Sequence, residues 1–316
     1  QEEKAMRRFL SGLVPFTILA LLPALPGKSG VEAQQRIKSL VDDDAGHVAL
    51  GLAIRRLGVS GTLLQAAAHP DDEHNGLYAM LTHGQGLRSV DVQTTRGAGG
   101  QNEIGPELFQ DIAVLRTAEL MAAHELDGAE QWFIRAIDFG YSFSPDEIYE
   151  VWGRDEVVSD FTRLIRTFRP EAVLTMNIQG GGGDRAHEAT AVLVREAFHA
   201  AGDPTRFPEQ MREGLRPWQP KKLYFTGGRG LPPGDPTLTT VNTNVFDPLL
   251  GRTYSEIGFD ARSNHKCQGM GQLSGLPGPG SGRGGRYLSL ETTVPWHMGR
   301  DEGSFLDGIA PGLTSL

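Results

Sequence analysis

The chain has 316 residues, of which 39% are hydrophobic and 22% charged, and its formal net charge at pH 7 is −9. These values are ordinary for a globular protein and leave room for one large α/β domain or two modest ones. The negative charge argues against a nucleic-acid partner, because polyanions bind basic surfaces, and no Lys/Arg-rich run offers a membrane-surface patch.

The N-terminal segment has the order of a secretory signal. Arg7 and Arg8 precede the apolar stretch "FLSGLVPFTILALLPAL", and small residues follow at Val31 and Ala33. We therefore expect residues 1–33 to be a signal peptide cleaved after Ala33, and the protein to be secreted or periplasmic. The alternative is an uncleaved membrane anchor, which the short apolar run and its prolines disfavour. The single cysteine, Cys267, excludes an internal disulfide and suits a periplasm better than a harsher exterior.

From Thr62 onward, strand-like and helix-like segments alternate. We expect strands at 62–68, 88–95, 131–136 and 171–177, and helices at 75–84, 106–126, within 144–170 and after residue 184. This alternation predicts an α/β fold with a Rossmann-like, mostly parallel sheet and helices on both faces. In such sheets, sites form at the carboxyl ends of the strands.

The pattern becomes looser after Pro204. We expect further strands at 221–226 and 239–246, a helix at 253–269 and a flexible loop at 275–285. The sequence thus predicts one main domain over residues 60–270. Residues 271–316 are expected to be a less regular Gly/Pro-rich extension, or the start of a further domain.

The stretch "AAAHPDDEHNG" places His69 directly behind the first predicted strand, with Asp71 and Asp72 in the first turn of the next helix. Helix capping explains one carboxylate there, but not three acidic groups beside a histidine. A divalent metal would neutralise the cluster and use His nitrogen and carboxylate oxygen together. A zinc site open to water needs a third ligand, and His187 is the best candidate because it follows a glycine loop at another strand's carboxyl end. The alternative is a purely structural His187.

Six motifs occur in order between Thr62 and Gln268: "AAAHPDDE", "TTRGAGGQNEIG", "LRTAEL", "FRPEAVLTMN", "DRAHEAT" and "NHKCQ". Taken together, they resemble the PIG-L/LmbE-like deacetylases. These are zinc-dependent N-acetylglucosaminyl deacetylases and related enzymes, which remove an acyl group, usually acetyl, from an amino sugar or similar amine.

The resemblance implies roles for individual residues. One Zn²⁺ per chain would be bound by three ligands, His69, Asp72 and His187. Asp71 would be the general base that activates water at the metal. Arg116, in "LRTAEL", matches an arginine that contacts the sugar, although it could instead pair with Glu119 or Glu107. His265, in "NHKCQ", matches a histidine that helps hold the oxyanion or protonates the leaving amine.

The chain departs from the family at one motif. Many members carry "HPDH" where this chain has "DRAH", so Asp184 stands where a histidine is often assigned to oxyanion stabilisation, and Ala186 replaces an aspartate. We expect Asp184 to face the substrate in that histidine's place.

The sequence therefore predicts an exported zinc-dependent N-deacetylase whose partner is a small molecule or glycan, with no nucleic acid and no stable membrane span once the signal is removed. Its substrate is expected to be an N-acetylated amino sugar or a related glycan. Two alternatives stay open: another metal-dependent amidase, and a zinc-containing carbohydrate-binding protein that has lost turnover.

Overall fold

The computed structural model describes residues 46–178, 184–227, 235, 237–272, 285–294, 304–310 and 312. The helices are α2 (Gly46–Arg56), α3 (Asn75–Ala79), α4 (Gln110–Asp127), α5 (Pro145–Trp152), α6 (Arg154–Phe168), α7 (Arg185–Gly202), α8 (Pro208–Arg212) and α9 (Tyr254–Arg262). The strands are β1 (Thr62–Ala67), β2 (Arg88–Gln93), β3 (Glu130–Phe133), β4 (Ala172–Thr175), β5 (Lys222–Thr226), β6 (Leu238–Val241), β7 (Phe246–Asp247), β8 (Arg252–Thr253) and β9 (Gly285–Thr292). The predicted signal segment lies outside these residues. Among the described helices, none has the length and apolar character needed to cross a membrane.

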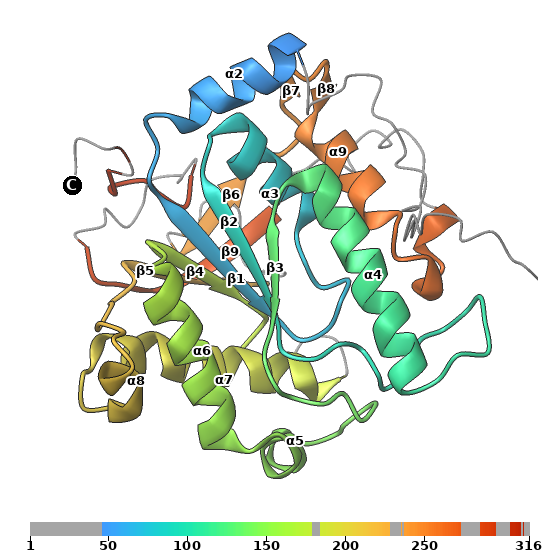
Figure 1. The fold of residues 1–316 in the computed structure, drawn as a ribbon, viewed down its shortest axis with the longest axis vertical. Coiled ribbons are helices and arrows are strands. Elements are labelled where there is room, and N and C mark those ends of the chain that lie inside the picture. Colours follow the sequence, from blue (N-terminus) through green and yellow to red (C-terminus); the bar gives the residue numbers. More distant parts are fainter. Residues whose placement is uncertain are drawn as a thin grey trace, which may run out of the picture. The chain divides into compact units, whose positions relative to one another are not determined.

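The main sheet has seven strands in the order β3-β2-β1-β4-β5-β9-β6 (Figure 1). The first five are all parallel, and β1 pairs with β2 on one side and with β4 on the other. Strand β9 is antiparallel to both of its neighbours. Since consecutive parallel strands run in the same direction, the segments that follow β1, β2 and β4 emerge at one edge of the sheet.

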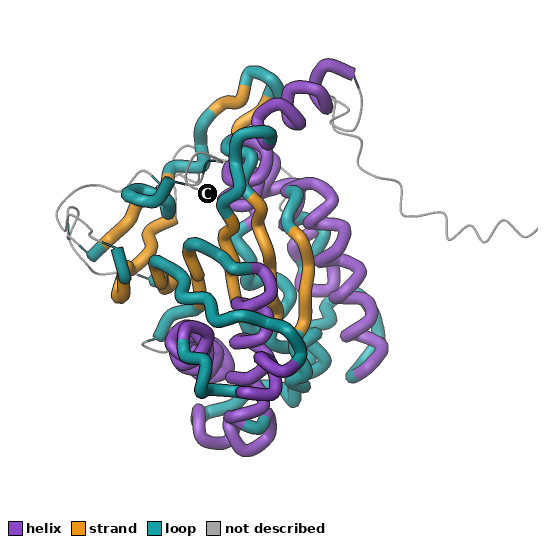
Figure 2. The backbone as a smooth tube through the Cα atoms, turned by 60° about the vertical axis from the view of Figure 1, so that its left-hand side comes forward, coloured by secondary structure: helices purple, strands orange, loops and turns teal. Residues whose placement is uncertain are grey.

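Helices cover both faces of this sheet (Figure 2). One face packs against apolar residues of α5, α6 and α7, such as Phe161 and Phe198. The other face packs against α2, α3 and α9 through residues such as Leu52, Leu77 and Ile257. The predicted Rossmann-like fold class is thereby confirmed, as burial of both faces explains the continuous apolar runs of the central strands.

Several predicted elements have different boundaries in the structure. Helix α4 begins at Gln110 rather than near Pro106, because Phe109 has a positive φ of 53° that no helix residue adopts. The segment 144–170 forms two helices, separated at Gly153, whose φ is +73°. Ser144 caps the first of these helices, since its side chain accepts a hydrogen bond from the backbone N–H of Asp146.

The described parts of the C-terminal segment contribute to the same core. Strand β9 lies between β5 and β6 in the main sheet. The ring of Phe305 lies 4.5 Å from that of Tyr224 on β5 and 4.8 Å from that of Tyr287 on β9, measured between centroids. Most of the predicted loop 275–285 lies outside the described residues, and a domain boundary after residue 270 stays a prediction.

Helices α3 and α9 cross at two glycines. A Cβ atom on Gly258 of α9 would lie 2.4 Å from the backbone nitrogen of Gly76 and 2.5 Å from its Cα. A Cβ on Gly76 itself would meet nothing closer than the Thr243 hydroxyl at 3.5 Å, which is ordinary contact. The close approach therefore depends on Gly258 alone.

We expect Gly258→Ala to lower the free energy of unfolding by about 1–3 kcal/mol, because overpacking against rigid backbone outweighs the gain in helix propensity. Gly76→Ala is the matched control and should stay within about 1 kcal/mol of the wild type. Urea unfolding followed by circular dichroism measures both. Equal effects of the two substitutions would contradict this account of the crossing.

Candidate metal centre

Two neighbouring strands bring the predicted ligands together. His69 follows β1 after a single residue, and Asp72 lies in the turn that leads to α3. His187 lies in the first turn of α7, the helix that follows β4. Because β1 and β4 pair directly and in parallel, both segments emerge at the same edge of the sheet.

One ligand atom from each of His69, Asp72 and His187 lies within 4.8 Å of the others. The Asp72 Oδ2 atom is 3.4 Å from His69 Nδ1 and 3.4 Å from His187 Nε2. Two zinc–ligand bonds of about 2.0–2.2 Å at a tetrahedral angle separate their donor atoms by about 3.4 Å. The donor set and its spacing thus fit a zinc-type ion.

The pKa shifts within the cluster favour a negatively charged Asp72 and positive charge beside it. Burial alone would raise the pKa of Asp72, but hydrogen bonds from His187 and His69 hold it well below its usual range. Burial alone would likewise lower the pKa of His187, yet the Asp72 carboxylate raises it to about 9. Without a metal, a proton on His187 supplies positive charge that the carboxylate needs.

Asp71 lies beside this cluster and is held from three directions. Its Oδ1 is 3.3 Å from Nη2 of Arg116, and its backbone N–H donates to Oε2 of Glu73 at 2.7 Å. Its carbonyl accepts a hydrogen bond from Nη1 of Arg262 at 2.6 Å. Burial and the neighbouring Asp72 charge raise the pKa of Asp71 to about 6, a value suited to a group that accepts a proton near neutral pH.

Arg116 is buried among backbone carbonyls beside Asp71. It is only 1% exposed, and its guanidinium donates to the carbonyls of Gly97, Gly100 and Pro70 as well as to Asp71. Gly97 has a φ of +69°, and a Cβ on it would lie 2.5 Å from the guanidinium. The glycine loop after β2 therefore closes on Arg116. Among the described residues, Arg116 forms its ion pair with Asp71 rather than with Glu119 or Glu107. Direct contact of Arg116 with a sugar stays a prediction.

Asp184 caps helix α7 and also faces a predicted ligand. Its Oδ1 accepts a hydrogen bond from the backbone N–H of Ala186 at 3.0 Å. Its Oδ2 lies 3.8 Å from Nε2 of His69, while Nδ1 of the same ring faces Asp72. Asp184 is thus positioned to orient the His69 ring, and its expected contact with substrate is untested.

His265 is fully buried, and its Nε2 forms a hydrogen bond with Oε1 of Glu73. Its Nδ1 has no hydrogen-bond partner among the described residues. The structure therefore does not bring His265 into the cluster of His69, Asp72 and His187, and its predicted contact with the oxyanion or the leaving amine stays a prediction. In the structure His265 instead forms a hydrogen bond with the buried Glu73 carboxylate.

Sequence reasoning gave no role to a buried network that continues from Glu73. Burial raises the pKa of Glu73, but His265 more than compensates and the pKa falls to about 2. Asn75 donates to both Glu73 and Asp127, and His124 forms a hydrogen bond with Asp127 at 2.9 Å. The signal in the sequence was the third acidic residue of "HPDDE", Glu73, to which neither the predicted ligand set nor the predicted base assigned a role.

Comparison with known proteins gives a family match within the described domain. Residues 64–198 match the family model described as PIG-L: GlcNAc-PI de-N-acetylase. The chain is 28% identical over 185 residues to a mycothiol S-conjugate amidase of Streptomyces coelicolor, covering 54% of this chain and 62% of that protein. It is 32% identical over 204 residues to a 1D-myo-inositol 2-acetamido-2-deoxy-alpha-D-glucopyranoside deacetylase of Kineococcus radiotolerans, covering 54% and 53%. The match thus spans little more than half the length of these relatives.

Solved structures share the fold. An N,N'-diacetylchitobiose deacetylase from Pyrococcus horikoshii aligns with a TM-score of 0.50 at 17% identity, covering 72% of this chain and 81% of that one. The 4-carboxy-2-hydroxymuconate hydratase of Pseudomonas putida aligns with a TM-score of 0.52 at 16% identity, covering 75% and 99%. Both likenesses concern the fold alone. The matched family model confirms the resemblance that the ordered motifs indicate: residues 64–198 match the PIG-L (LmbE-like) family.

Proposed function

We propose that this chain is a zinc-dependent N-deacetylase that hydrolyses the acetamide of an N-acetylated amino sugar or related glycan. The observation that carries the proposal is the cluster of His69, Asp72 and His187 with Asp71 beside it, inside a PIG-L family domain. Relatives named as deacetylases support the reaction type. The signal-like segment before Ala33 supports export of this activity.

In the proposed reaction His69, Asp72 and His187 hold the ion. Zinc, when bound, polarises the amide carbonyl and lowers the pKa of water at the site to about 7. Asp71 removes the proton from the attacking water, because it lies beside the predicted ligands. Its ion pair with Arg116 keeps the carboxylate in place. Asp71 then returns that proton to the leaving amine nitrogen. We assign this second step to Asp71 as well, because His265 is buried against Glu73.

The first experiment measures acetate release from N-acetylglucosamine, N,N'-diacetylchitobiose and an N-acetylglucosaminyl inositol by the zinc-loaded chain. We expect release that requires the metal, and a fall in kcat of roughly 10²–10⁴-fold in Asp71→Asn, because general-base catalysis contributes about that much. Asp155→Asn, an exposed carboxylate at the start of α6, is the matched control and should leave kcat unchanged.

The rate should fall at acidic pH as the Asp71 carboxylate becomes protonated, so Asp71 should control the acid limb of the pH–rate profile. Its pKa of about 6 in the metal-free protein sets an upper bound, since a bound cation favours the carboxylate and moves the limb lower. If Asp71→Asn retained both the rate and this acid limb, Asp71 would not be the base.

Metal affinity should rise with pH up to about 9. His187 is protonated at neutral pH in the metal-free protein, with a pKa of about 9, and only the neutral imidazole binds zinc. Zinc binding at pH 7 therefore releases protons, which calorimetry in buffers of different ionisation enthalpy measures directly.

The same pKa fixes the sign of a stability change. A folded pKa raised above the unfolded value of 6.5 stabilises the metal-free protein below pH 6.5, and this stabilisation is lost as pH rises through about 9. The Tm of the metal-free protein should fall over that range, while the increase in Tm on adding zinc grows. His187→Ala should remove both trends, whereas His199→Ala, an exposed histidine on the same helix, should retain them.

A second candidate is a metal-dependent amidase of a different acyl group, which the relative named as a mycothiol S-conjugate amidase favours. Release of amine without acetate from a panel of N-acyl glucosamines would identify it. A protein that binds zinc and sugar with the same affinity in Asp71→Ala, and releases no amine in either form, would be a binding protein.

A further inference from the structure

The backbone at Asp71 has an unusual conformation. Its φ is 117°, in a region that glycine adopts and that side chains disfavour. A non-glycine residue persists there only when its surroundings over-determine the conformation, and such residues cluster at functional sites. The partners of this one peptide unit therefore identify the groups on which the position of the carboxylate depends.

Both backbone groups of Asp71 are bound by side chains from elsewhere in the turn and the fold. Its N–H is bound by Glu73, which is in turn buried against His265. Its carbonyl is bound by Arg262 of α9, a residue 191 positions later in the chain, at 2.6 Å. Nη2 of Arg262 also lies 3.9 Å from Oδ2 of Asp71.

The two arginines at Asp71 differ in what else they do. Arg116 is buried and donates to three other carbonyls, so it supports the whole glycine loop. The Arg262 side chain is 34% exposed, and it forms both a hydrogen bond and an ion pair with Asp71. Arg262 can thus be changed with less damage to the surrounding structure.

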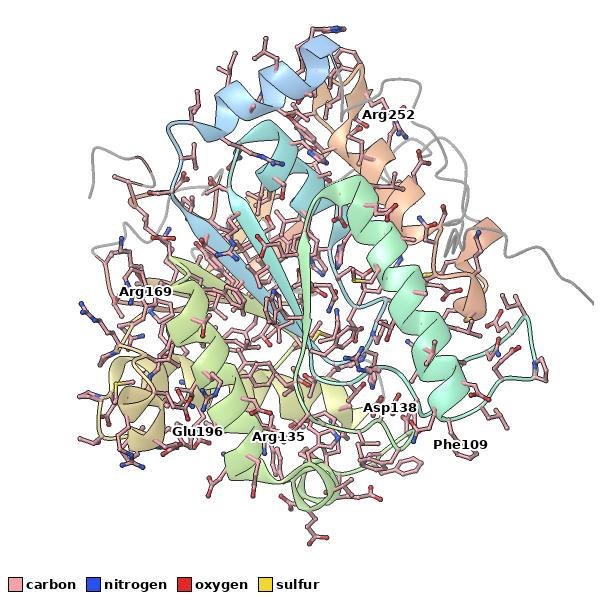
Figure 3. The ribbon with its side chains drawn as sticks, viewed as in Figure 1. Phe109, Arg135, Asp138, Arg169, Glu196 and Arg252 are labelled. Atoms are coloured by element: carbon pink, nitrogen blue, oxygen red, sulfur yellow. The ribbon has the colours of Figure 1, made fainter. Side chains whose placement is uncertain are left out.

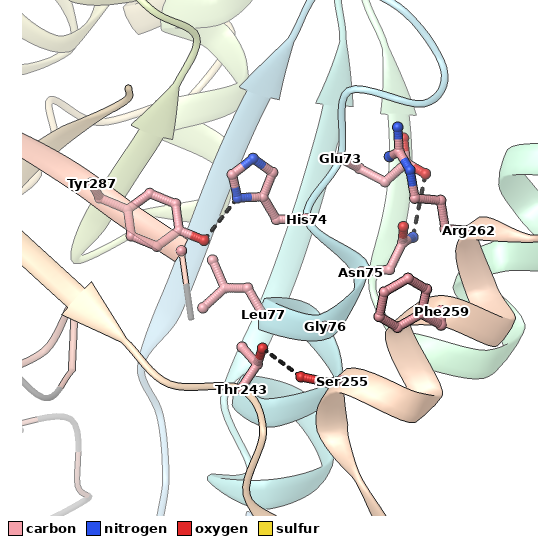
Figure 4. Close-up of a pocket in the computed structure, with 12 residues that line it drawn as sticks. Glu73, His74, Asn75, Gly76, Leu77, Thr243, Ser255, Phe259, Arg262 and Tyr287 are labelled. Carbon is pink, nitrogen blue, oxygen red and sulfur yellow. Dashed lines mark hydrogen bonds between the residues drawn. The ribbon is translucent and has the colours of Figure 1, made fainter. Parts of the chain in front are cut away.

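Arg262 also lines a cavity of about 220 Å³ between the turn, α3 and α9 (Figure 4). Figure 4 shows Phe259 and Ser255 on the same helix as Arg262, facing Asn75 and Gly76. The Arg262 side chain therefore lies beside open space rather than within packed core, in agreement with its 34% exposure. A shortened side chain would leave room there for a small cation.

We propose that Arg262 is a positioning residue: it holds the strained Asp71 peptide so that the carboxylate stays beside the cluster of His69, Asp72 and His187. The inference rests on the proposed function for its catalytic consequence, but the hold on the Asp71 peptide is a property of the metal-free chain. In this role Arg262 acts through Asp71 and contacts neither the predicted metal ligands nor the metal.

The kinetic test compares Arg262→Ala and Arg262→Lys with Arg252→Ala in the zinc-loaded chain. Arg252 lies near the opposite end of α9, pairs with Asp260 and is labelled in Figure 3, so it is the matched control. We expect Arg262→Ala to lower kcat roughly 10²-fold, as a misplaced catalytic group does, with KM and zinc affinity within a few-fold of wild type. Arg262→Lys should recover part of kcat, because one N–H donor suffices for a carbonyl.

Millimolar guanidinium should also restore part of kcat in Arg262→Ala, with saturation, and have no effect on wild type or Arg252→Ala. An unchanged kcat in Arg262→Ala, or a loss explained by weaker zinc binding, would overturn the positioning role.

A second readout needs no metal and no substrate. Urea unfolding of the metal-free chain should show that Arg262→Ala lowers the midpoint less in the Asp71→Gly background than in the wild type, because glycine adopts a φ of 117° without strain. Additive effects would overturn the inference. Non-additive changes in the urea midpoint would support the contact between Arg262 and the Asp71 peptide even if the wild type released no acetate. The absence of acetate release would contradict only the proposed function, so the two failures are distinguishable.

Discussion

The turn from Pro70 to Glu73 is the constraint on which the rest of the site depends. Three adjacent acidic residues follow a buried strand, and buried carboxylates are costly unless each has a partner. The fold gives each a different one: Asp72 faces two histidines, Asp71 lies between two arginines, and Glu73 is bound to His265. Asp71 has a φ of 117° within this turn, so the chain departs there from both helix and strand geometry.

Helices α4 and α9 supply the partners, so their packing is coupled to the site. Helix α4 carries Arg116 across to the turn, and α9 together with the residues after it carries Arg262 and His265. Helix α9 also packs closely against α3, where a Cβ on Gly258 would lie 2.4 Å from the backbone nitrogen of Gly76. Removing one member of a buried charged pair typically costs about 3–5 kcal/mol, so the supports are also part of the stability of the domain.

Much of the fold could be predicted from the sequence because its signals are local. The strands after Thr62 are short apolar runs ending at turn residues, and the alternation with helices limits the topology to few choices. The grouping of His69 and Asp72 with His187 followed from parallel strands ending at one edge. Strand β9 was not predicted, since its partners β5 and β6 are fixed by long-range pairing and its sequence lies next to a Gly/Pro-rich segment.

The parts of the site that escaped prediction are those decided by backbone acceptors. Nothing in "LRTAEL" reveals that Arg116 binds the carbonyls of Gly97, Gly100 and Pro70, because every residue has a carbonyl and only the fold selects which ones converge. The same holds for Arg262, whose partner is a peptide group in a conformation that the residue type disfavours. His265 follows the family motif, yet its burial depends on how α9 ends and on where Glu73 points.

The shared fold does not by itself decide the chemistry, since a hydratase and a deacetylase both align with it. The chemistry is decided by what surrounds the ligands, and here the departure at Asp184 matters. Asp184 places a carboxylate 3.8 Å from Nε2 of His69, where many family members carry a histidine. A carboxylate there makes the imidazole a more basic ligand and fixes its orientation, but it cannot donate a hydrogen bond to a developing oxyanion. In the proposed deacetylase, stabilisation of the oxyanion would therefore depend more on the bound ion than in family members that carry a histidine at this position.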